Sequence, residues 1–294
     1  SANSNADTAI SKAQGTPQIN EPAVQMAVEK LQSLQKNAAN DSASALTQDI
    51  LDAIQNLADT VAEAAADKQE AVLAAENALS QTKPVSNEAA TAQAISDLQA
   101  LLADENSTAE AVREATKALT AATASDTTER NATNSDAAGA ISDEQASTVA
   151  TDESVLTAIQ NLKDAQNKAA NETVDAAGHA WVSQDIVDAM TALQDAVTAA
   201  EQAQDTARDE ATALIQDAIQ TSPVTNEPAI TDAKSVLQDV INDPNATAAD
   251  LDDAMAAYQG VIDQTKKQRG SVNDTATDAL ASADDSDLKA DQGV

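Results

Sequence analysis

The sequence contains no cysteine and only two aromatic residues, Trp181 and Tyr258. Without cysteine the chain cannot form a disulfide bond or a cysteine-ligated metal site. Aromatic side chains usually anchor strands, and only six glycines and six prolines are available for turns among 294 residues. These scarcities disfavour a β-fold and predict an all-α protein.

Basic residues are also scarce. The chain has 16 Lys and Arg against 49 Asp and Glu, which gives a formal net charge of −33. Phosphates repel such a chain, so we expect no nucleic-acid partner and no anionic membrane surface as a ligand. No apolar run approaches the roughly 20 residues that span a bilayer, so we expect no membrane insertion in this segment. The first residues lack the basic and apolar regions of a signal peptide, which indicates a mature chain or an excerpt.

Large aliphatic residues are few: Leu, Ile, Val and Phe together number 50, or 17% of the chain, which is a composition typical of disorder. Their spacing indicates the opposite. After each of four Asn-Glu or Asp-Glu pairs, apolar residues recur at intervals of three and four, the period of one helical face. The pairs are Asn20-Glu21, Asn87-Glu88, Asp152-Glu153 and Asn226-Glu227. A disordered segment has no need for this register, so the pattern predicts folded helices.

A longer repeat contains these stripes. Residues 47–53 recur as residues 183–189, and residues 84–88 recur as residues 223–227. Hydroxyl residues stand where helix N-caps are expected, at Thr47, Thr108, Ser183 and Thr247. Asp250 forms a near capping box with Thr247. Because no Gly or Pro interrupts residues 47–83 or 183–222, we expect long helices that pass from one repeat into the next.

This pattern implies three helices per repeat, the third of one repeat continuing as the first of the next. The predicted repeats are residues 1–66, 67–130, 131–200 and 201–270, and residues 271–294 begin a further repeat or form a disordered tail. The expected fold is all-α, with tandem three-helix bundles joined by continuous shared helices into a spectrin-like rod. A core of Ala, Val and Leu stabilises each repeat by only a few kcal/mol.

The fourth repeat carries the most specific pattern. Residues 240–247 read apolar-apolar-Asn-Asp-Pro-Asn-Ala-Thr, and an amphipathic helix follows them. This element resembles the FIVAR module, and residues 104–108 of the second repeat are similar but lack the proline. The first and third repeats depart from it, with longer loops at residues 40–47 and 171–183.

The resemblance implies a three-helix bundle that occurs in tandem in giant surface proteins and adhesins of Gram-positive bacteria. It therefore implies an extracellular location, with attachment to the cell wall through parts of the protein outside this chain. It implies no catalytic residues.

Two functions agree with these observations. The first is a non-catalytic stalk or spacer, a monomeric rod that presents an adhesive domain. The alternative is an adhesion module in which the repeats themselves bind a host matrix protein or glycan. The sequence shows neither a nucleophile with a base nor a sheltered carboxylate pair, so we expect no enzyme and no cofactor.

One segment differs from the repeats. His179, the only histidine, and Trp181, the only tryptophan, lie in an insertion at residues 176–182. An exposed Trp beside a His is a candidate contact for a sugar ring or a partner's pocket. The alternative is a hydrophobic staple against the helix that follows. One histidine without cysteine predicts no zinc site, and the acidic clusters at residues 104–106 and 284–287 lack the spacing of a calcium loop.

Overall fold

The computed structural model describes residues 1–40, 44–221 and 224–284, and these residues are predominantly helical. The all-α prediction is confirmed, and the described residues pair in strand fashion only at an isolated bridge between Val174 and Ala180. None of the described helices is long and apolar enough to cross a bilayer. In chain order the elements are α1 (Ala2–Gln14), the 3-10 helix η1 (Pro17–Asn20), α2 (Pro22–Asn40), α3 (Ser44–Ser80), α4 (Ala89–Ala103), α5 (Ala109–Gln145), α6 (Glu153–Ala170), α7 (Ser183–Thr221), α8 (Pro228–Asn242) and α9 (Ala248–Asp284).

Four of these helices are unusually long. The helices α3, α5 and α9 each contain 37 residues and α7 contains 39, so each is about 55–60 Å long at 1.5 Å per residue. The uninterrupted helices predicted over residues 47–83 and 183–222 are confirmed as α3 and α7, which end at Ser80 and Thr221. Abundant alanine, the best helix former, favours this continuity.

Two of the four predicted N-caps are confirmed. Thr108 precedes α5, and its Oγ1 accepts a hydrogen bond from the backbone N–H of Ala111 at 3.2 Å. Thr247 precedes α9 and forms a reciprocal capping box with Asp250: Thr247 Oγ1 accepts from the Asp250 N–H at 3.2 Å, and Asp250 Oδ2 accepts from the Thr247 N–H at 2.9 Å. Hydrogen bonds from the Thr247 hydroxyl and N–H lower the pKa of Asp250.

The other two predicted N-caps are wrong. The helix α3 begins at Ser44, so Thr47 lies inside it, because residues 44–46 contain no Gly or Pro that would delay the start of the helix. Ser183 is the first residue of α7, and its hydroxyl donates to Glu88 Oε1 at 2.6 Å instead of capping its own helix. Of the predicted loops, residues 41–43 and Pro223 lie outside the described residues, as does the end of the tail at 285–294.

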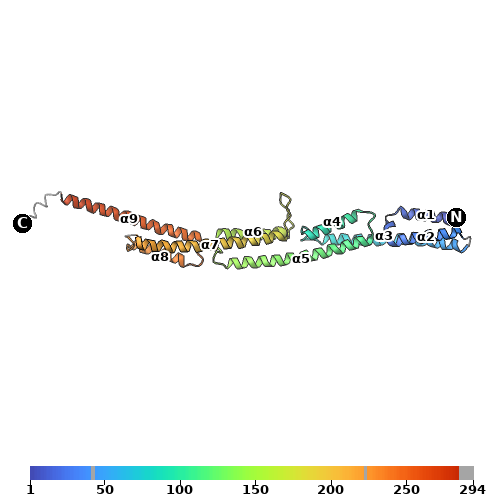
Figure 1. Ribbon diagram of the computed structural model, residues 1–294, viewed down its shortest axis with the longest axis horizontal. Helices are drawn as coiled ribbons and strands as arrows, with labels where there is room; N and C mark the ends of the chain where they lie inside the picture. The colour runs from blue at the N-terminus through green and yellow to red at the C-terminus, as the bar shows by residue number, and fades with distance from the viewer. Residues whose placement is uncertain (41–43, 222–223, 285–294) are drawn as a thin grey trace, which may run out of the picture. The chain divides into compact units, whose positions relative to one another are not determined.

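The chain divides into two compact units, Ser1–Ser135 with Ala165–Ile186 and Asp136–Asp164 with Val187–Val294. In the first unit, α1, α2 and the first half of α3 lie side by side and share a core that includes Leu31, Ile50 and Leu57 (Figure 1). The second half of α3, α4 and the start of α5 share another core, in which Leu98 and Leu119 are fully buried.

The second unit contains a core of the same kind. The second half of α7, α8 and the first half of α9 surround Ile230, Leu237 and Tyr258. Tyr258 is the largest fully buried side chain of the described residues, and burial raises the pKa of its phenol. Small residues such as Ala207 and Ala211 complete this core. In each of these three places the apolar stripes of three helical segments meet. The division into four repeats stays a prediction.

The sparse core makes Tyr258 the residue whose truncation should cost most in the second unit. We expect Tyr258→Ala to lower the free energy of unfolding there by about 3–5 kcal/mol, because it leaves a cavity among α7, α8 and α9. Hydrogen exchange of the α8 amides should accelerate accordingly. The control is Val236→Ala, at an exposed position of α8, which should change the free energy of unfolding by less than about 0.5 kcal/mol. Equal effects of the two variants would contradict the assignment of this core.

Candidate functional site

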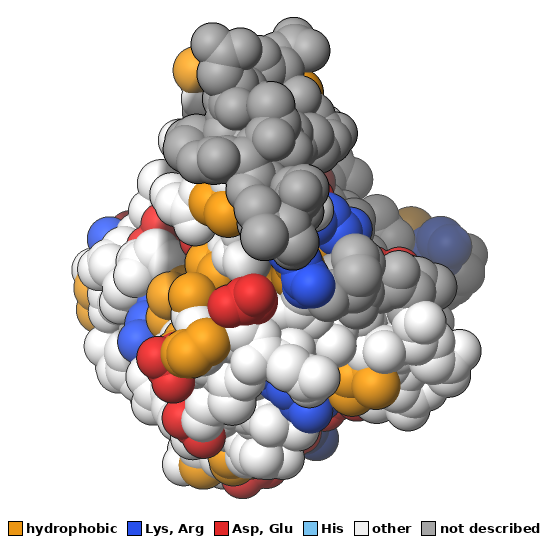
Figure 2. All heavy atoms as spheres, turned by 90° about the vertical axis from the view of Figure 1, so that its left-hand side faces the viewer, with side chains coloured by type: hydrophobic (Ala, Val, Ile, Leu, Met, Phe, Trp, Pro, Cys, Tyr) orange, Lys and Arg blue, Asp and Glu red, His pale blue; other side chains and the backbone are white. Residues whose placement is uncertain are grey.

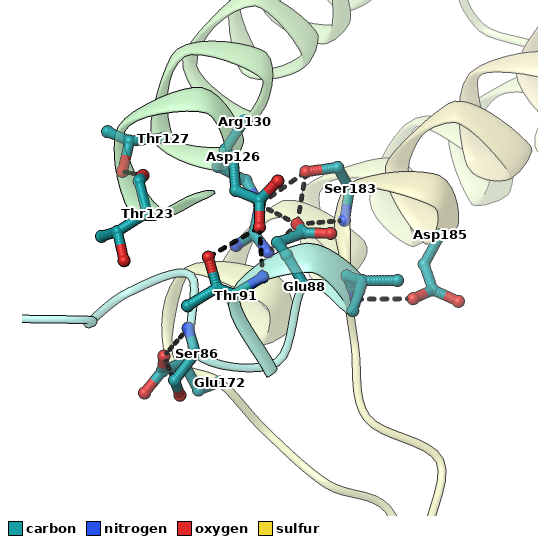
Figure 3. Close-up of polar contacts among 11 residues, drawn as sticks. Ser86, Glu88, Thr91, Thr123, Asp126, Thr127, Arg130, Glu172, Ser183 and Asp185 are labelled. Atoms are coloured by element: carbon teal, nitrogen blue, oxygen red, sulfur yellow. Dashed lines mark hydrogen bonds and ion pairs between the residues drawn. The ribbon is translucent and has the colours of Figure 1, made fainter. Parts of the chain in front are cut away.

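A buried polar cluster surrounds Glu88, which directly precedes α4 (Figure 3). One oxygen, Glu88 Oε1, accepts hydrogen bonds from the N–H of Ser183 at 2.8 Å and from the Ser183 hydroxyl at 2.6 Å. The same oxygen accepts from Nε of Arg130 at 2.9 Å and from its Nη2. Arg130, on α5, is only 3% exposed, and its Nε also donates to Ser183 Oγ at 2.8 Å. Glu88 therefore joins the start of α4 to α5 and to the first residue of α7.

The electrostatics of this cluster favour an ionised Glu88. Burial acts to raise the pKa of Glu88, but the hydrogen bonds from Ser183 and Arg130 outweigh it, and the pKa lies below its ordinary value. The N-terminus of a helix also carries a partial positive charge and unpaired N–H groups, which favour a carboxylate. Glu88 thus supplies negative charge both to the start of α7 and to the buried guanidinium.

Two further carboxylates extend the cluster. Asp126, buried on α5, accepts through Oδ2 from the N–H of Thr91 at 2.9 Å and from its hydroxyl at 2.7 Å. Since Thr91 is the third residue of α4, Asp126 caps that helix from a neighbouring one. Glu172, which follows α6 with a left-handed φ of 51°, accepts through Oε1 from the N–H of Ser86 at 2.7 Å and from its hydroxyl at 2.5 Å.

The first Asn-Glu pair makes an equivalent contact at the start of α5. Glu21 is buried, and its Oε1 accepts from the N–H of Ala109, the first residue of α5, at 2.6 Å. Asn20 Nδ2 donates to the carbonyl of Asn106 at 3.1 Å, and Lys68 of α3 donates to the carbonyl of Glu105 at 2.5 Å. We call the Glu21–Ala109 and Glu88–Ser183 contacts the carboxylate clamps.

The start of α9 is held in another way. Gln204 Nε2 of α7 donates to the carbonyls of Ala246 at 2.6 Å and Pro244 at 3.2 Å. Arg208 Nη2 donates to the carbonyls of Asp243 at 2.8 Å and Pro244 at 3.0 Å. Glu153, the counterpart of Glu21 and Glu88 in the repeat, is exposed. At the start of α9 the carboxylate is local, since Asp250 forms the capping box with Thr247.

The structure brings His179 and Trp181 together in the loop between α6 and α7. Gly178 adopts a φ of +87°, and Asp175 Oδ1 accepts from the N–H groups of Ala177 at 2.8 Å and His179 at 2.9 Å. The backbone hydrogen bond from His179 is the main cause of a lowered pKa of Asp175. His179 Nε2 lies 2.8 Å from Asp185 Oδ1.

The indole of Trp181 is half-buried, and its neighbours are polar. Lys168 Nζ lies 4.2 Å from the centroid of the ring, a cation–π contact, and the His179 ring meets it in a T-shaped arrangement at 5.6 Å. Lys168 therefore occupies one face of the indole ring, which the sequence suggested as a contact for a sugar ring or a partner's pocket. A ligand contact by His179 and Trp181 stays a prediction.

The remaining candidates offer little chemistry. No group of three or more His, Asp or Glu among the described residues is placed to hold a metal ion. In the acidic cluster at residues 104–106, Asp104 Oδ1 accepts from the N–H of Asn106 at 2.9 Å, which is a turn contact, and residues 285–287 of the second cluster lie outside the described residues. On the face in Figure 2, acidic, basic and apolar side chains are interspersed.

Sequence reasoning identified Glu21 and Glu88 only as helix starts. The recurrence of the Asn-Glu pair was a signal for these positions, but the partners lie 88 and 95 residues away and share no local pattern with them. No pattern in the sequence indicated that Arg130 would be buried or would bind Glu88.

No protein-family model matches the chain, and no curated protein or solved structure shows a significant match to it. The resemblance to the FIVAR module therefore depends on the residues of the sequence alone.

We expect Glu88→Gln to lower the free energy of unfolding of the first unit by about 3 kcal/mol at pH 7, because it removes the charge that faces the buried Arg130. The pKa of Glu88 is lower in the folded chain than in the unfolded chain. Its stabilisation is therefore complete above the unfolded value, about 4.3, and decreases as the pH falls through the folded value.

Urea unfolding of the native chain and of Glu88→Gln between pH 7 and pH 3 measures this difference directly. The difference in unfolding free energy should diminish below about pH 4.3. Glu153→Gln is the matched control: this exposed side chain occupies the same place in the repeat, and its replacement should have little effect at any pH. If the difference in unfolding free energy between the native chain and Glu88→Gln does not change with pH, the charge of the Glu88 carboxylate does not cause the destabilisation.

Proposed function

We propose that this chain is a non-catalytic stalk segment of a bacterial surface protein. In this proposal the four predicted repeats are three-helix bundles in tandem, joined by the long helices, and they hold an adhesive domain away from the cell wall. The resemblance of the fourth repeat to the FIVAR module supports the extracellular, cell-wall-attached location.

The observation that carries the proposal is the pair of carboxylate clamps. Glu21 belongs to the first predicted repeat and binds the start of the third helix of the second, at Ala109. Glu88 belongs to the second predicted repeat and binds the corresponding helix of the third, at Ser183. A rigid spacer keeps its repeats at fixed angles to one another. A continuous helix provides one connection between neighbours, and a clamp provides a second one beside it, which opposes bending.

Composition supports the same function. A net charge of −33 keeps the surface solvated and opposes lateral association, which suits a monomeric stalk. Apart from Tyr258 in the core, the titratable groups with shifted pKa values form ion pairs, caps and turns, and hydroxyls beside carboxylates, such as Ser183 beside Glu88, belong to the same structural contacts. We therefore assign no catalytic role.

Small-angle X-ray scattering of the chain tests the proposal. We expect an extended monomer with a maximum dimension of roughly 100–150 Å, because four repeats, each with helices of about 17 to 20 residues at about 1.5 Å per residue, follow one another in this proposal. Replacing both clamp residues, Glu21→Ala with Glu88→Ala, should broaden the distribution of interatomic distances, because the repeats then bend more freely. Glu153→Ala should leave the scattering unchanged. A compact globular envelope for the native chain would contradict the stalk function.

The loop with His179 and Trp181 favours the second candidate, an adhesion module. Its side chains are accessible, with His179 51% exposed, and backbone hydrogen bonds fix the loop geometry. A panel of glycans and matrix proteins should be compared for the native chain, Trp181→Ala and the control Val174→Ala, which alters an exposed residue of the same loop. If the module binds through this loop, we expect at least a tenfold loss of affinity for Trp181→Ala alone. Binding that is absent, or equal in all three proteins, would exclude this role for the loop.

A further inference from the structure

The C-terminal half of α9 presents an apolar face that no described helix covers. The core shared with α7 and α8 ends at Ile262, and α9 continues to Asp284 beyond α8 (Figure 1). Leu280 is 71% exposed, and Val272 and Ala276 are also exposed. In water, an apolar stripe of this kind is unfavourable unless another surface covers it.

The same stripe occurs twice elsewhere in the chain, where it is buried. In all three copies an asparagine is followed three residues later by alanine and four residues after that by isoleucine or leucine. The copies are Asn3, Ala6 and Ile10 in α1, Asn134, Ala137 and Ile141 in α5, and Asn273, Ala276 and Leu280 in α9. Ile10 is 7% exposed and Ile141 is 8% exposed, and both alanines are fully buried. Only the copy in α9 is open.

The contacts of the first copy show what kind of partner fits this face. In α1 it packs against the apolar stripes of α2 and of the first half of α3, which include Leu31 and Ile50. A glutamine of α2 marks the register: Gln35 Nε2 donates to the carbonyl of Asn3 at 3.1 Å and to Asp7 Oδ1 at 2.9 Å.

The second copy repeats the same polar contact. Gln166 Nε2 of α6 donates to the carbonyl of Asn134 at 3.2 Å. In both buried copies, therefore, the helix whose glutamine reaches the backbone of the asparagine also carries buried apolar residues, such as Leu31 in α2 and Leu162 in α6. Asn273 offers the same carbonyl at the same place in α9.

We propose that the C-terminal half of α9 is a docking face for a pair of amphipathic helices of the α2–α3 type, whose glutamine bonds to the carbonyl of Asn273. The inference rests on the proposed organisation in repeats, and it adds the chemistry of the partner that this face takes. Asp274 and Asp278 flank the stripe, which disfavours an anionic membrane surface as the occupant.

A chimera tests the fit. Residues 15–66 of the chain are joined directly after Asp284 in place of residues 285–294, so that Leu280 takes the position that Ile10 has before α2. We expect the amides of residues 272–284 to exchange at least about tenfold more slowly in the chimera than in the native chain, because the added helices cover them. Leu280→Asp should abolish this protection in the chimera and should leave the stability of the native chain unchanged.

Ala281→Asp is the control, since it adds the same charge one residue away, at the counterpart of the exposed Ser11. Replacing the glutamine of the added copy, Gln35→Ala, should reduce the protection without abolishing it. No added protection in the chimera, or equal effects of Leu280→Asp and Ala281→Asp, would overturn the inference. If the native chain dimerises and Leu280→Asp abolishes the dimer, a second copy of the chain covers the C-terminal half of α9. That result would also overturn the inference. Each of these results is independent of the scattering of the native chain, which tests the stalk function.

Discussion

The unpaired N–H groups at the start of a helix need hydrogen-bond acceptors, and this requirement determines which loops of the chain pack against the starts of α5 and α7. Each helix leaves about four such groups at its N-terminus. At α5 and α7 a distant glutamate satisfies part of the need, through Glu21 and Glu88. A cap that comes from about 90 residues away is also a tertiary contact. The chain therefore uses a local requirement of helices to fix which loop lies against which helix.

The Glu88 cluster specifies the fold more than it stabilises it. In a buried ion pair the loss of hydration of both groups cancels much of their mutual attraction, so the net stabilisation by a pair such as Glu88 and Arg130 is small compared with the cost of breaking it. A wrong partner, however, would leave a buried charge unpaired, which costs several kcal/mol. Helices with similar apolar stripes can pair in the wrong order. The clamps differ from one another, with Lys68 beside the first and Arg130 in the second, whereas Gln204 and Arg208 hold the start of α9. This variety penalises incorrect pairings.

The sequence was sufficient where the determinants are local. The length of α3 and α7 follows from uninterrupted residues with high helix propensity, and the caps at Thr108 and Thr247 follow from contacts within three residues. The prediction failed at Ser183 because Glu88, 95 residues away, competes for its hydroxyl. It failed at Thr47 because no residue among 44–46 prevents an earlier start.

The candidate site shows the same division between local and distant determinants. His179 and Trp181 were found because they are unique in the sequence, whereas the contact of Trp181 with Lys168 depends on how α6 meets the loop. Arg130 lies in a stretch of Ala, Thr, Asp and Glu without apolar periodicity, and only the fold shows that it is buried.

The apolar and polar contacts make different contributions, and their combination explains how a chain with few large aliphatic residues specifies one arrangement. Fully buried alanines such as Ala6, Ala75 and Ala211 allow helices to approach, but many pairs of apolar stripes satisfy the same spacing. Such a core gives helices a general tendency to associate and discriminates weakly among partners. Side chains such as Gln35 and Glu88 favour one register, because these half-buried polar groups bond to particular backbone atoms. The polar contacts therefore select the partner and register, and the alanine-rich stripes supply most of the favourable free energy.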